Sequence, residues 1–299
     1  MIRLGLCCKF IKEPIHFRTT TATYLSRLKN IHPFLNELCT HNVHALEDSI
    51  EYCIAHKIGC FRISSRFLPV ATHPDFLYSI DDLPSSGEIL TTLQRCKKRA
   101  KEANIRLSFH PDQFVLLSSK DEAIIEKSLR DLEYHTYLAT YVGADVINIH
   151  GGGAYDNKTT ALTRFVKNFS RLSKKAQQLL TIENDDRVYT PTDLLPLCKE
   201  LKIPLVYDAH HHRCLPDQLS IEEGTQKALS TWNREPLFHI SSPLHNKKFR
   251  SHNDYVDSKD VPECWKKVPN LTVEVEAKAK EKAVLRLYKE LKKRNWPIH

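Results

Sequence analysis

The sequence predicts an α/β fold, a single (β/α)8 TIM barrel that spans residues 1–299. Eight short apolar runs alternate with longer segments of helical periodicity along the chain, which is the pattern of a parallel barrel. The runs are almost continuously apolar, as strands buried on both faces are. No linker-like stretch or shift in composition divides the chain, so one domain is expected. A doubly wound open sheet is the alternative arrangement of the same elements.

The expected strands are short and rich in Leu, Ile and Val. They are Ile2–Leu6, Cys60–Ile63, Arg106–His110, Val146–His150, Leu179–Glu183, Leu205–Asp208, Phe238–Ile240 and Leu271–Glu276. Between them, apolar residues recur at helical spacing and predict one buried face for each helix. The clearest of these faces lie in Leu46–Ile54, Ile125–Leu132 and Leu162–Phe169.

Local signals predict where two of the helices begin. Ser220 and Glu223 have the spacing of a capping box, and Pro191 occupies a first helical position. A further helical stretch, Lys278–Arg294, holds eight basic and two acidic residues and so carries most of the formal net charge of +8. In a barrel this helix runs from the rim down the outside, so much of that charge is expected on a solvated face.

The composition is that of a globular protein, with 41% hydrophobic and 27% charged residues. The apolar runs are far shorter than the ~18 residues of a membrane span and no secretory signal opens the chain, so no membrane partner is expected. The nine cysteines are odd in number and contain no CxxC pair. This argues against a disulfide framework or a Cys-rich zinc site and favours a reducing, cytoplasmic location.

Ionisable side chains stand at or near the ends of the last six apolar runs. They are His110, His150, Glu183, Asp208, His239 and Glu276. Because the carboxyl ends of barrel strands converge on one rim, we expect these side chains to lie close together. Unpaired charges at that distance are costly. Three histidines and three carboxylates without thiolates favour a divalent metal such as Mn, Zn or Fe, although any one of them alone fits an ordinary structural hydrogen bond.

Further candidate ligands lie in the segments that follow the strands. Asp208 and His211 are three residues apart and can both reach a metal if the chain turns off the strand there. The histidines on either side of His211 are then expected to orient the ligands. His73 and His252 follow the second and seventh expected strands on the same rim side. Each of these two alone would be interpreted as an exposed loop histidine.

Two segments near the rim suggest contact with a substrate. Gln113 and Phe114 place an amide and an aromatic ring just beyond His110. On nucleic acid such a pair can probe or stack on bases at a distorted site, and the alternative for Phe114 is packing under a loop. Gly151–Gly153 directly follows the fourth strand and fits either a phosphate cradle or a tight turn.

Eight short motifs are distributed in order over nearly the whole chain. They are Phe61–Ser65, Thr72–Pro74, Ser108–Phe114, Asn148–Gly153, Glu183–Asp186, Asp208–His212, Ser251–Val256 and Val275–Lys278. Each alone is weak, but the ordered set is specific and resembles the UV-damage endonucleases.

The resemblance implies a TIM barrel related to the type IV abasic-site endonucleases, with up to three divalent metal ions, Mn first and Mg, Zn or Co as alternatives. It implies double-stranded DNA with UV lesions as the substrate, and a monomer is expected. Cleavage immediately 5′ to a photoproduct such as a pyrimidine dimer would leave a 3′-hydroxyl and a 5′-phosphate. The metal ligands it implies are His73, His110, His150, Glu183, Asp208, His211, His239, His252 and Glu276.

Roles within this set follow from the resemblance and from the order of the strands. Glu183, His239 and Glu276 are the expected catalytic residues. Glu183 is placed to bridge two metals, because the fifth strand end lies between the candidate ligands of strands three and four and those of strands six and eight. Gln113 and Phe114 match the family's Gln–aromatic probe, which wedges into the duplex at the lesion.

The chain departs from the family pattern at three positions. Many members have a lysine two residues before the seventh-strand histidine, where this chain has Leu237. Near the first strand the family commonly has an aromatic residue after the glycine and an asparagine further on, where this chain has Leu6 and Phe10. These changes bear on the metal complement and the lesion range, but all nine ligand positions are filled.

Other functions fit parts of the same pattern. An abasic-site endonuclease would share the fold and the metals. A sugar isomerase or epimerase would use similar ligands on a small substrate, with no exposed probe and little salt dependence, whereas a DNA enzyme loses affinity steeply with salt. A non-catalytic DNA-binding protein would hold metal in closed structural sites, but nine ligands shared by up to three ions leave room for water.

Overall fold

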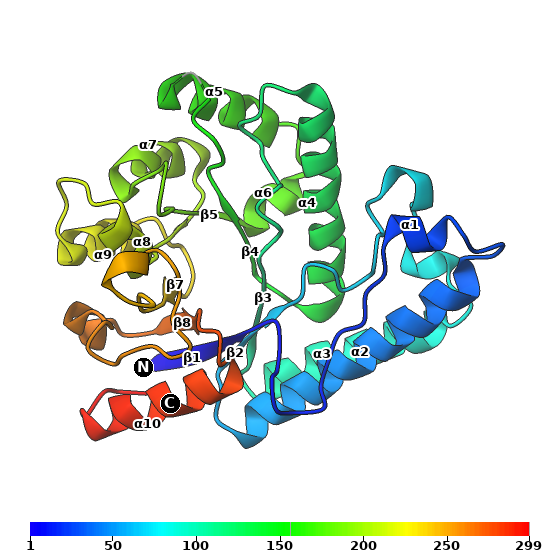
Figure 1. The fold of residues 1–299 in the computed structure, drawn as a ribbon, viewed down its shortest axis with the longest axis horizontal. Coiled ribbons are helices and arrows are strands. Elements are labelled where there is room, and N and C mark those ends of the chain that lie inside the picture. The colour runs from blue at the N-terminus through cyan, green and yellow to red at the C-terminus, as the bar shows by residue number, and fades with distance from the viewer. Residues whose placement is uncertain (156, 299) are drawn as a thin grey trace.

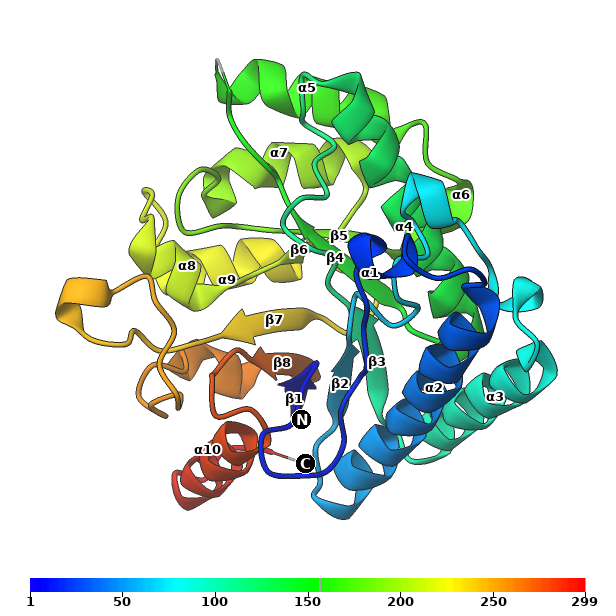
Figure 2. The same cartoon turned by 45° about the vertical axis from the view of Figure 1, so that its right-hand side comes forward.

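In residues 1–155 and 157–298, which the computed structural model describes, eight parallel strands form one sheet that curls into a barrel, with helices on its outside (Figures 1 and 2). The strands are β1 (Ile2–Cys7), β2 (Cys60–Ile63), β3 (Arg106–Phe109), β4 (Val146–His150), β5 (Leu180–Glu183), β6 (Leu205–Val206), β7 (Leu237–Ile240) and β8 (Leu271–Val275). Their order around the sheet is β6-β5-β4-β3-β2-β1-β8-β7.

The ring closes between β6 and β7. A parallel bridge joins Asp208 to His239, and the backbone N–H of His239 donates a hydrogen bond of 3.1 Å to the carbonyl oxygen of Tyr207. The predicted (β/α)8 TIM barrel is therefore confirmed, and the open doubly wound sheet is excluded.

Helices connect consecutive strands and cover the barrel. They are α1 (Ala22–Leu25), α2 (His32–Ala55), α3 (Ser86–Glu102), α4 (Glu122–Val142), α5 (Lys158–Phe169), α6 (Lys174–Leu179), α7 (Pro191–Leu201), α8 (Ala209–Cys214), α9 (Ile221–Leu229) and α10 (Glu281–Lys293). Short 3₁₀ helices cover Pro74–Phe76, Ile80–Asp82, Asn246–Lys248 and Glu263–Lys267. Among the described residues, no helix combines the length and the apolar character needed to cross a membrane.

Several expected strands end sooner than predicted. β3, β6 and β8 stop one or two residues early, so His110, Asp208 and Glu276 lie just beyond the strands. At Asp208 the reason is a helix cap, because its carboxylate accepts a hydrogen bond of 2.7 Å from the backbone N–H of His211 and begins α8. The predicted first residue of the fifth strand, Leu179, is the last residue of α6.

The predicted helix starts are confirmed at α7 and α9, where Thr190 and Ser220 each form a complete capping box. The C-terminal helix begins at Glu281, three residues later than predicted. Lys280 has φ 49° and ψ −121°, which no helical residue adopts. Its N–H closes a turn on the carbonyl oxygen of Ala277 at 3.3 Å.

Most buried apolar side chains, from Ile2 to Ile298, form one connected cluster that includes residues of the strands and of the helices around them, and Val146, Val206 and Leu237 form a second, small cluster. The helix faces predicted from periodicity are buried there, including Leu46 of α2 and Leu132 of α4. α2 and α3 pack side by side on one flank (Figures 1 and 2). The two ends of the chain meet, because the N–H of Ile2 donates to the carbonyl oxygen of Pro297 at 2.9 Å.

The glycine triplet after β4 is a closely packed turn. Gly152 has φ +85°, which favours glycine, and a Cβ there would meet Ser118 Oγ at 2.4 Å. A Cβ on Gly151 would meet the ring of Tyr189 at 2.7 Å. Conformation and space therefore account for two of the three glycines without a phosphate.

Candidate metal centre

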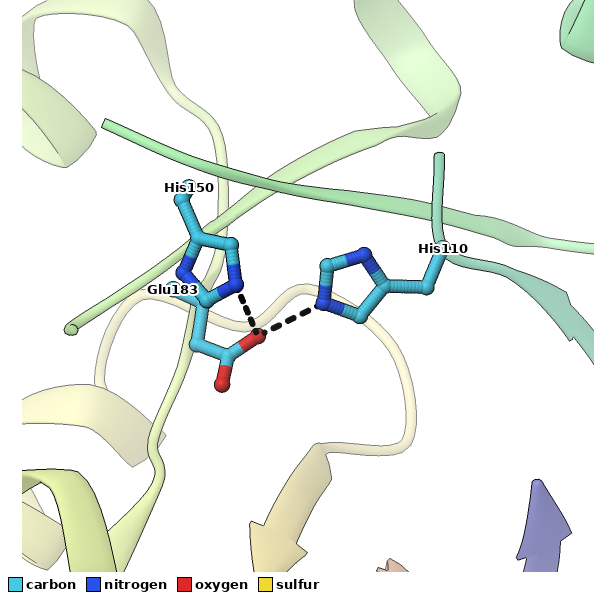
Figure 3. Close-up of side chains that lie close together, drawn as sticks. All are labelled: His110, His150 and Glu183. Carbon is cyan, nitrogen blue, oxygen red and sulfur yellow. Dashed lines mark hydrogen bonds and ion pairs between the residues drawn. The ribbon is translucent and has the colours of Figure 1, made fainter. Parts of the chain in front are cut away.

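Two histidines from neighbouring strands point at one carboxylate on the rim (Figure 3). The parallel register of β4 and β5 pairs His150 with Glu183, and His110 follows β3 next to them. Nε2 of His110 lies 3.1 Å from Glu183 Oε2, and Nε2 of His150 lies 4.0 Å from the same oxygen. The side chain of Glu183 is only 1% exposed. These three residues can together hold a metal ion.

The other carboxylate oxygen of Glu183 faces the opposite side of the rim. Nδ1 of His239 lies 3.1 Å from Glu183 Oε1 and 3.4 Å from Glu276 Oε1. His110, His239 and Glu276 form a second group whose ligand atoms lie within 4.8 Å of one another. Each oxygen of Glu183 thus faces histidines that come from different strands.

A third group forms where the chain turns off β6. Nδ1 of His211 lies 3.2 Å from Glu183 Oε1 and 3.7 Å from Asp208 Oδ2, and these three residues also meet the geometry of a metal site. Asn184 fixes the backbone at Asp208, because its side chain donates to the Asp208 carbonyl oxygen at 2.9 Å and accepts from the Asp208 N–H at 3.0 Å. Glu183 belongs to two of the three groups, and its role as a bridge between two metals stays a prediction.

Unsatisfied polar atoms indicate that the cluster fits a cation. Glu183 Oε1, Asp208 Oδ2 and His239 Nδ1 are buried and make no hydrogen bond among the described residues, although Glu183 Oε1 and His239 Nδ1 lie only 3.1 Å apart as an ion pair. Leaving such an atom unpaired costs about 1–3 kcal/mol, and an ion among them would supply the missing partner. Nitrogen and carboxylate oxygen without thiolate is the donor set expected for Mn²⁺, Zn²⁺ or Co²⁺.

The electrostatics of the cluster follow from burial and close charges. Burial raises the pKa of Glu183, but the surrounding histidines, His239 first, outweigh it and hold the pKa well below its usual range. Burial lowers the pKa of His239, but Glu183 and then Glu274 outweigh it and raise that pKa to about 10. The Glu183 carboxylate is therefore ionised and is compensated by the imidazolium of His239, whose charge a divalent cation can replace.

Two of the predicted ligands lie further out. Nδ1 of His252 is 3.7 Å from Glu276 Oε2, and its ring lies against the ring of His211. His73 precedes the 3₁₀ helix Pro74–Phe76, where its Nδ1 accepts the Asp75 N–H at 3.3 Å. Neither belongs to the three groups formed by the described residues. Their role as ligands stays a prediction.

The predicted probe stands on the surface. The side chain of Phe114 is 62% exposed, so it does not pack under a loop. It lines a cavity of about 440 Å³ together with His73 and Tyr134. Gln113 is exposed beside it.

Sequence reasoning missed two buried charged residues that support the rim from below. Arg62 and Glu274 lie within the apolar runs of β2 and β8, and Nη1 of Arg62 is 2.7 Å from Glu276 Oε1. Asn148 was also missed, although its amide donates to Glu183 Oε2 at 2.6 Å. The position of Arg62 and Glu274 in the sequence could have indicated their role. A charged residue inside a strand that is buried on both faces needs a partner of opposite charge within the barrel.

Fold and site define a class: a TIM barrel whose carboxyl rim carries histidine–carboxylate groups able to hold metal ions. The chain belongs to the UV-endonuclease UvdE family, which matches residues 2–296. The resemblance seen in the sequence motifs is thereby confirmed.

Individual proteins agree with this assignment. The UV DNA damage endonuclease of Bacillus cereus (strain G9842) is 35% identical over 252 residues, which is 81% of this chain and 78% of the relative. The crystal structure of SacUVDE matches 99% of this chain and 100% of its own with a TM-score of 0.90 and 28% identity. Endonuclease IV from Thermus thermophilus shares the fold, with a TM-score of 0.62 and 13% identity over 98% of each chain.

Proposed function

We propose that this protein is a metal-dependent DNA repair endonuclease that hydrolyses the phosphodiester bond immediately 5′ to a UV photoproduct and leaves a 3′-hydroxyl and a 5′-phosphate. Family membership and the names of the relatives support UV-damaged double-stranded DNA as the substrate. The observation that carries the hydrolytic chemistry is the convergence of three candidate metal groups on Glu183.

Nine side chains would hold up to three divalent ions, with Mn²⁺ first and Mg²⁺, Zn²⁺ or Co²⁺ as alternatives. They are His73, His110, His150, Glu183, Asp208, His211, His239, His252 and Glu276. Bound ions would supply a water of lowered pKa and positive charge opposite the phosphate oxygens. Among the catalytic residues, Glu183 presents one oxygen to each side of the site, and Nδ1 of His239 lies 3.4 Å from Glu276 Oε1 where β7 and β8 end.

Lesion recognition is assigned to Gln113 and Phe114. A damaged, poorly stacked nucleotide is cheaper to displace from the duplex, and an exposed aromatic ring can fill the vacated space. On the other side of the site, Lys9, Lys278 and Lys280 line a hollow of about 350 Å³ next to Glu276. These lysines place positive charge next to the candidate metal groups, where it can face the DNA backbone. We expect a monomer that acts in the cytoplasm.

The test uses a 5′- or 3′-labelled duplex with one pyrimidine dimer and a matched undamaged duplex. Protein freed of metal with a chelator and reloaded with Mn²⁺ is expected to make a single nick 5′ to the dimer. A DNA polymerase must extend the new 3′ end directly, and a phosphatase must remove the new 5′-phosphate. Cleavage that is equal on the undamaged duplex, or that persists in excess chelator, would contradict the proposal. A duplex with one abasic site tests the abasic-site alternative in the same assay.

A further inference from the structure

Below the rim, an arginine and a glutamate form an ion pair enclosed within the barrel. The side chains of Arg62 and Glu274 are 8% and 1% exposed. Nε of Arg62 donates to Glu274 Oε2 at 2.5 Å. The other oxygen, Oε1, accepts hydrogen bonds from the Ser108 hydroxyl and, at 3.8 Å, from the Cys60 thiol. Residues of β2, β3 and β8 therefore meet at one buried carboxylate.

This carboxylate reaches the imidazole of His239 on the neighbouring strand. The register of β7 and β8 pairs His239 with Glu274, and Nε2 of His239 lies 3.1 Å from Glu274 Oε2. Nη2 of Arg62 lies 2.9 Å from the same imidazole nitrogen. The other ring nitrogen, Nδ1, faces the candidate metal groups and has no hydrogen-bond partner among the described residues.

Which hydrogen bond Nε2 makes decides what Nδ1 can do. Metal binding requires the neutral ring, and if Nε2 of that ring keeps its hydrogen and donates it to Glu274, the lone pair of Nδ1 is free and points toward Glu183 and Glu276. If Nε2 instead accepts from the guanidinium, the hydrogen of a neutral ring is on Nδ1, which then cannot bind a metal. A histidine that binds a metal ion usually donates its other N–H to a carboxylate or a carbonyl group, so the carboxylate favours the first arrangement.

Stabilisation of the fold does not by itself explain why Arg62 and Glu274 are buried together. A buried ion pair often contributes little net stability compared with apolar residues of similar size, because both charges lose water. Arg62 offsets the cost by contacting Glu274 and, at 2.7 Å, Glu276 Oε1. Gly5 provides the space, since a Cβ there would lie 3.1 Å from Glu274 Cγ. Because Glu274 is held as a charged group next to the candidate ligand His239, we expect it to act on His239.

We infer that Glu274 is a positioning residue: by accepting the Nε2 hydrogen of His239 it directs Nδ1 at the metal centre, while Arg62 balances the charge of Glu274. Glu274 belongs to none of the three candidate metal groups formed by the described residues. The inference rests on the metal centre of the proposed function.

The experiment measures Mn²⁺ affinity in the absence of DNA, from the EPR signal of free Mn²⁺ during titration of the full chain. Glu274→Gln keeps the shape of the side chain and removes its charge. Its Mn²⁺ affinity is expected to fall about 10- to 100-fold. The matched control is Glu235→Gln, which removes a carboxylate paired with Arg3 away from the rim and should change the affinity less than about twofold. Equal affinities of Glu274→Gln and wild type would overturn the inference.

A second variant covers the case in which Glu274→Gln does not fold because Arg62 is left without its partner. Arg62→Gln combined with Glu274→Gln removes both charges and should fold, but bind Mn²⁺ as weakly as expected for the single variant. Wild-type affinity in this double variant would contradict the role of Glu274 as well.

A spectroscopic measurement separates positioning from a general structural role. In ¹⁵N-histidine-labelled protein loaded with diamagnetic Zn²⁺, His239 should show its hydrogen on Nε2, and Glu274→Gln should lose that signature. If wild type binds no Mn²⁺ or Zn²⁺, the inference and the metal centre of the proposed function both fail. If metal binding depends on Glu274 but damaged DNA is not cut, only the proposed function fails.

Discussion

Charged side chains are arranged in opposite ways at the two ends of the barrel. At the amino ends of the strands, Arg106 makes two hydrogen bonds of 2.9 Å to Asp145, and Arg3 donates to Glu235 at 2.8 Å. At the carboxyl rim, Glu183 is surrounded by histidines and leaves an oxygen without a hydrogen bond. Matched pairs at one end serve the fold, whereas the side chains gathered at the other end form groups that could hold metal ions.

The largest effect is expected from Glu183→Gln at the rim. Loss of the shared carboxylate disrupts two of the three candidate metal groups, so single-turnover incision of a dimer-containing duplex should fall by at least about 10³-fold, equivalent to several kcal/mol. The protein should still fold, as judged by circular dichroism. Incision at the wild-type rate would remove Glu183 from the mechanism.

A substitution at the amino ends of the strands should lower the stability of the protein and leave its activity unchanged. Arg106→Ala removes both hydrogen bonds to Asp145, which keeps only Arg234 at 3.8 Å, and also removes a hydrogen bond of 3.1 Å to Thr272. The free energy of unfolding in urea should fall by about 2–4 kcal/mol. At a temperature where the variant is folded, its incision rate should match wild type. A large loss of incision without a loss of stability would contradict the division between the two ends.

Phe114→Ala should act on the substrate alone. An exposed ring contributes little to the fold, but stacking on a base is worth about 1–3 kcal/mol. The preference for damaged over undamaged duplex, measured by binding competition, should therefore fall about tenfold. Mn²⁺ affinity and melting temperature serve as controls and should stay at wild-type values. A change in Mn²⁺ affinity would mean that the ring supports the metal centre.

A similarly small effect is expected for Asp217, whose carboxylate lies 2.9 Å from Nε2 of His212. Burial raises the pKa of Asp217, but hydrogen bonds, first from Thr192 and then from Leu219 and His212, outweigh it and lower the pKa to about 2. Because the folded pKa lies below the unfolded one, the contribution to stability is present above about pH 4 and is lost as the pH falls toward 2.

Asp217→Asn should therefore cost about 1–2 kcal/mol of unfolding free energy at pH 7 and at pH 5, and about half of that at pH 3. Urea denaturation of both proteins at the three pH values measures the difference. A difference that is the same at pH 3 and pH 7 would show that the charge of Asp217 does not stabilise the fold.

The sequence was sufficient for the barrel because eight apolar runs are hard to arrange otherwise, and for the rim because strand ends must converge. It could not place His73, since the loop that carries it is set by contacts distant in the sequence. Arg62 and Glu274 were overlooked because each lies inside an apolar run, where only the closed barrel shows that they face one another. The late start of α10 depends on the backbone of Lys280, which its side-chain type does not signal.

The seam between β6 and β7 has a consequence for local motion. Seven strand pairs hold the sheet with at least two registered residue pairs each, but the seam relies on the bridge between Asp208 and His239. Segments with few such bonds open at lower free energy than the rest of a fold. Opening here separates two candidate ligands while the other strands stay paired. The amide of His239, which reaches across to Tyr207, is thus the hydrogen-exchange reporter for assembly of the site.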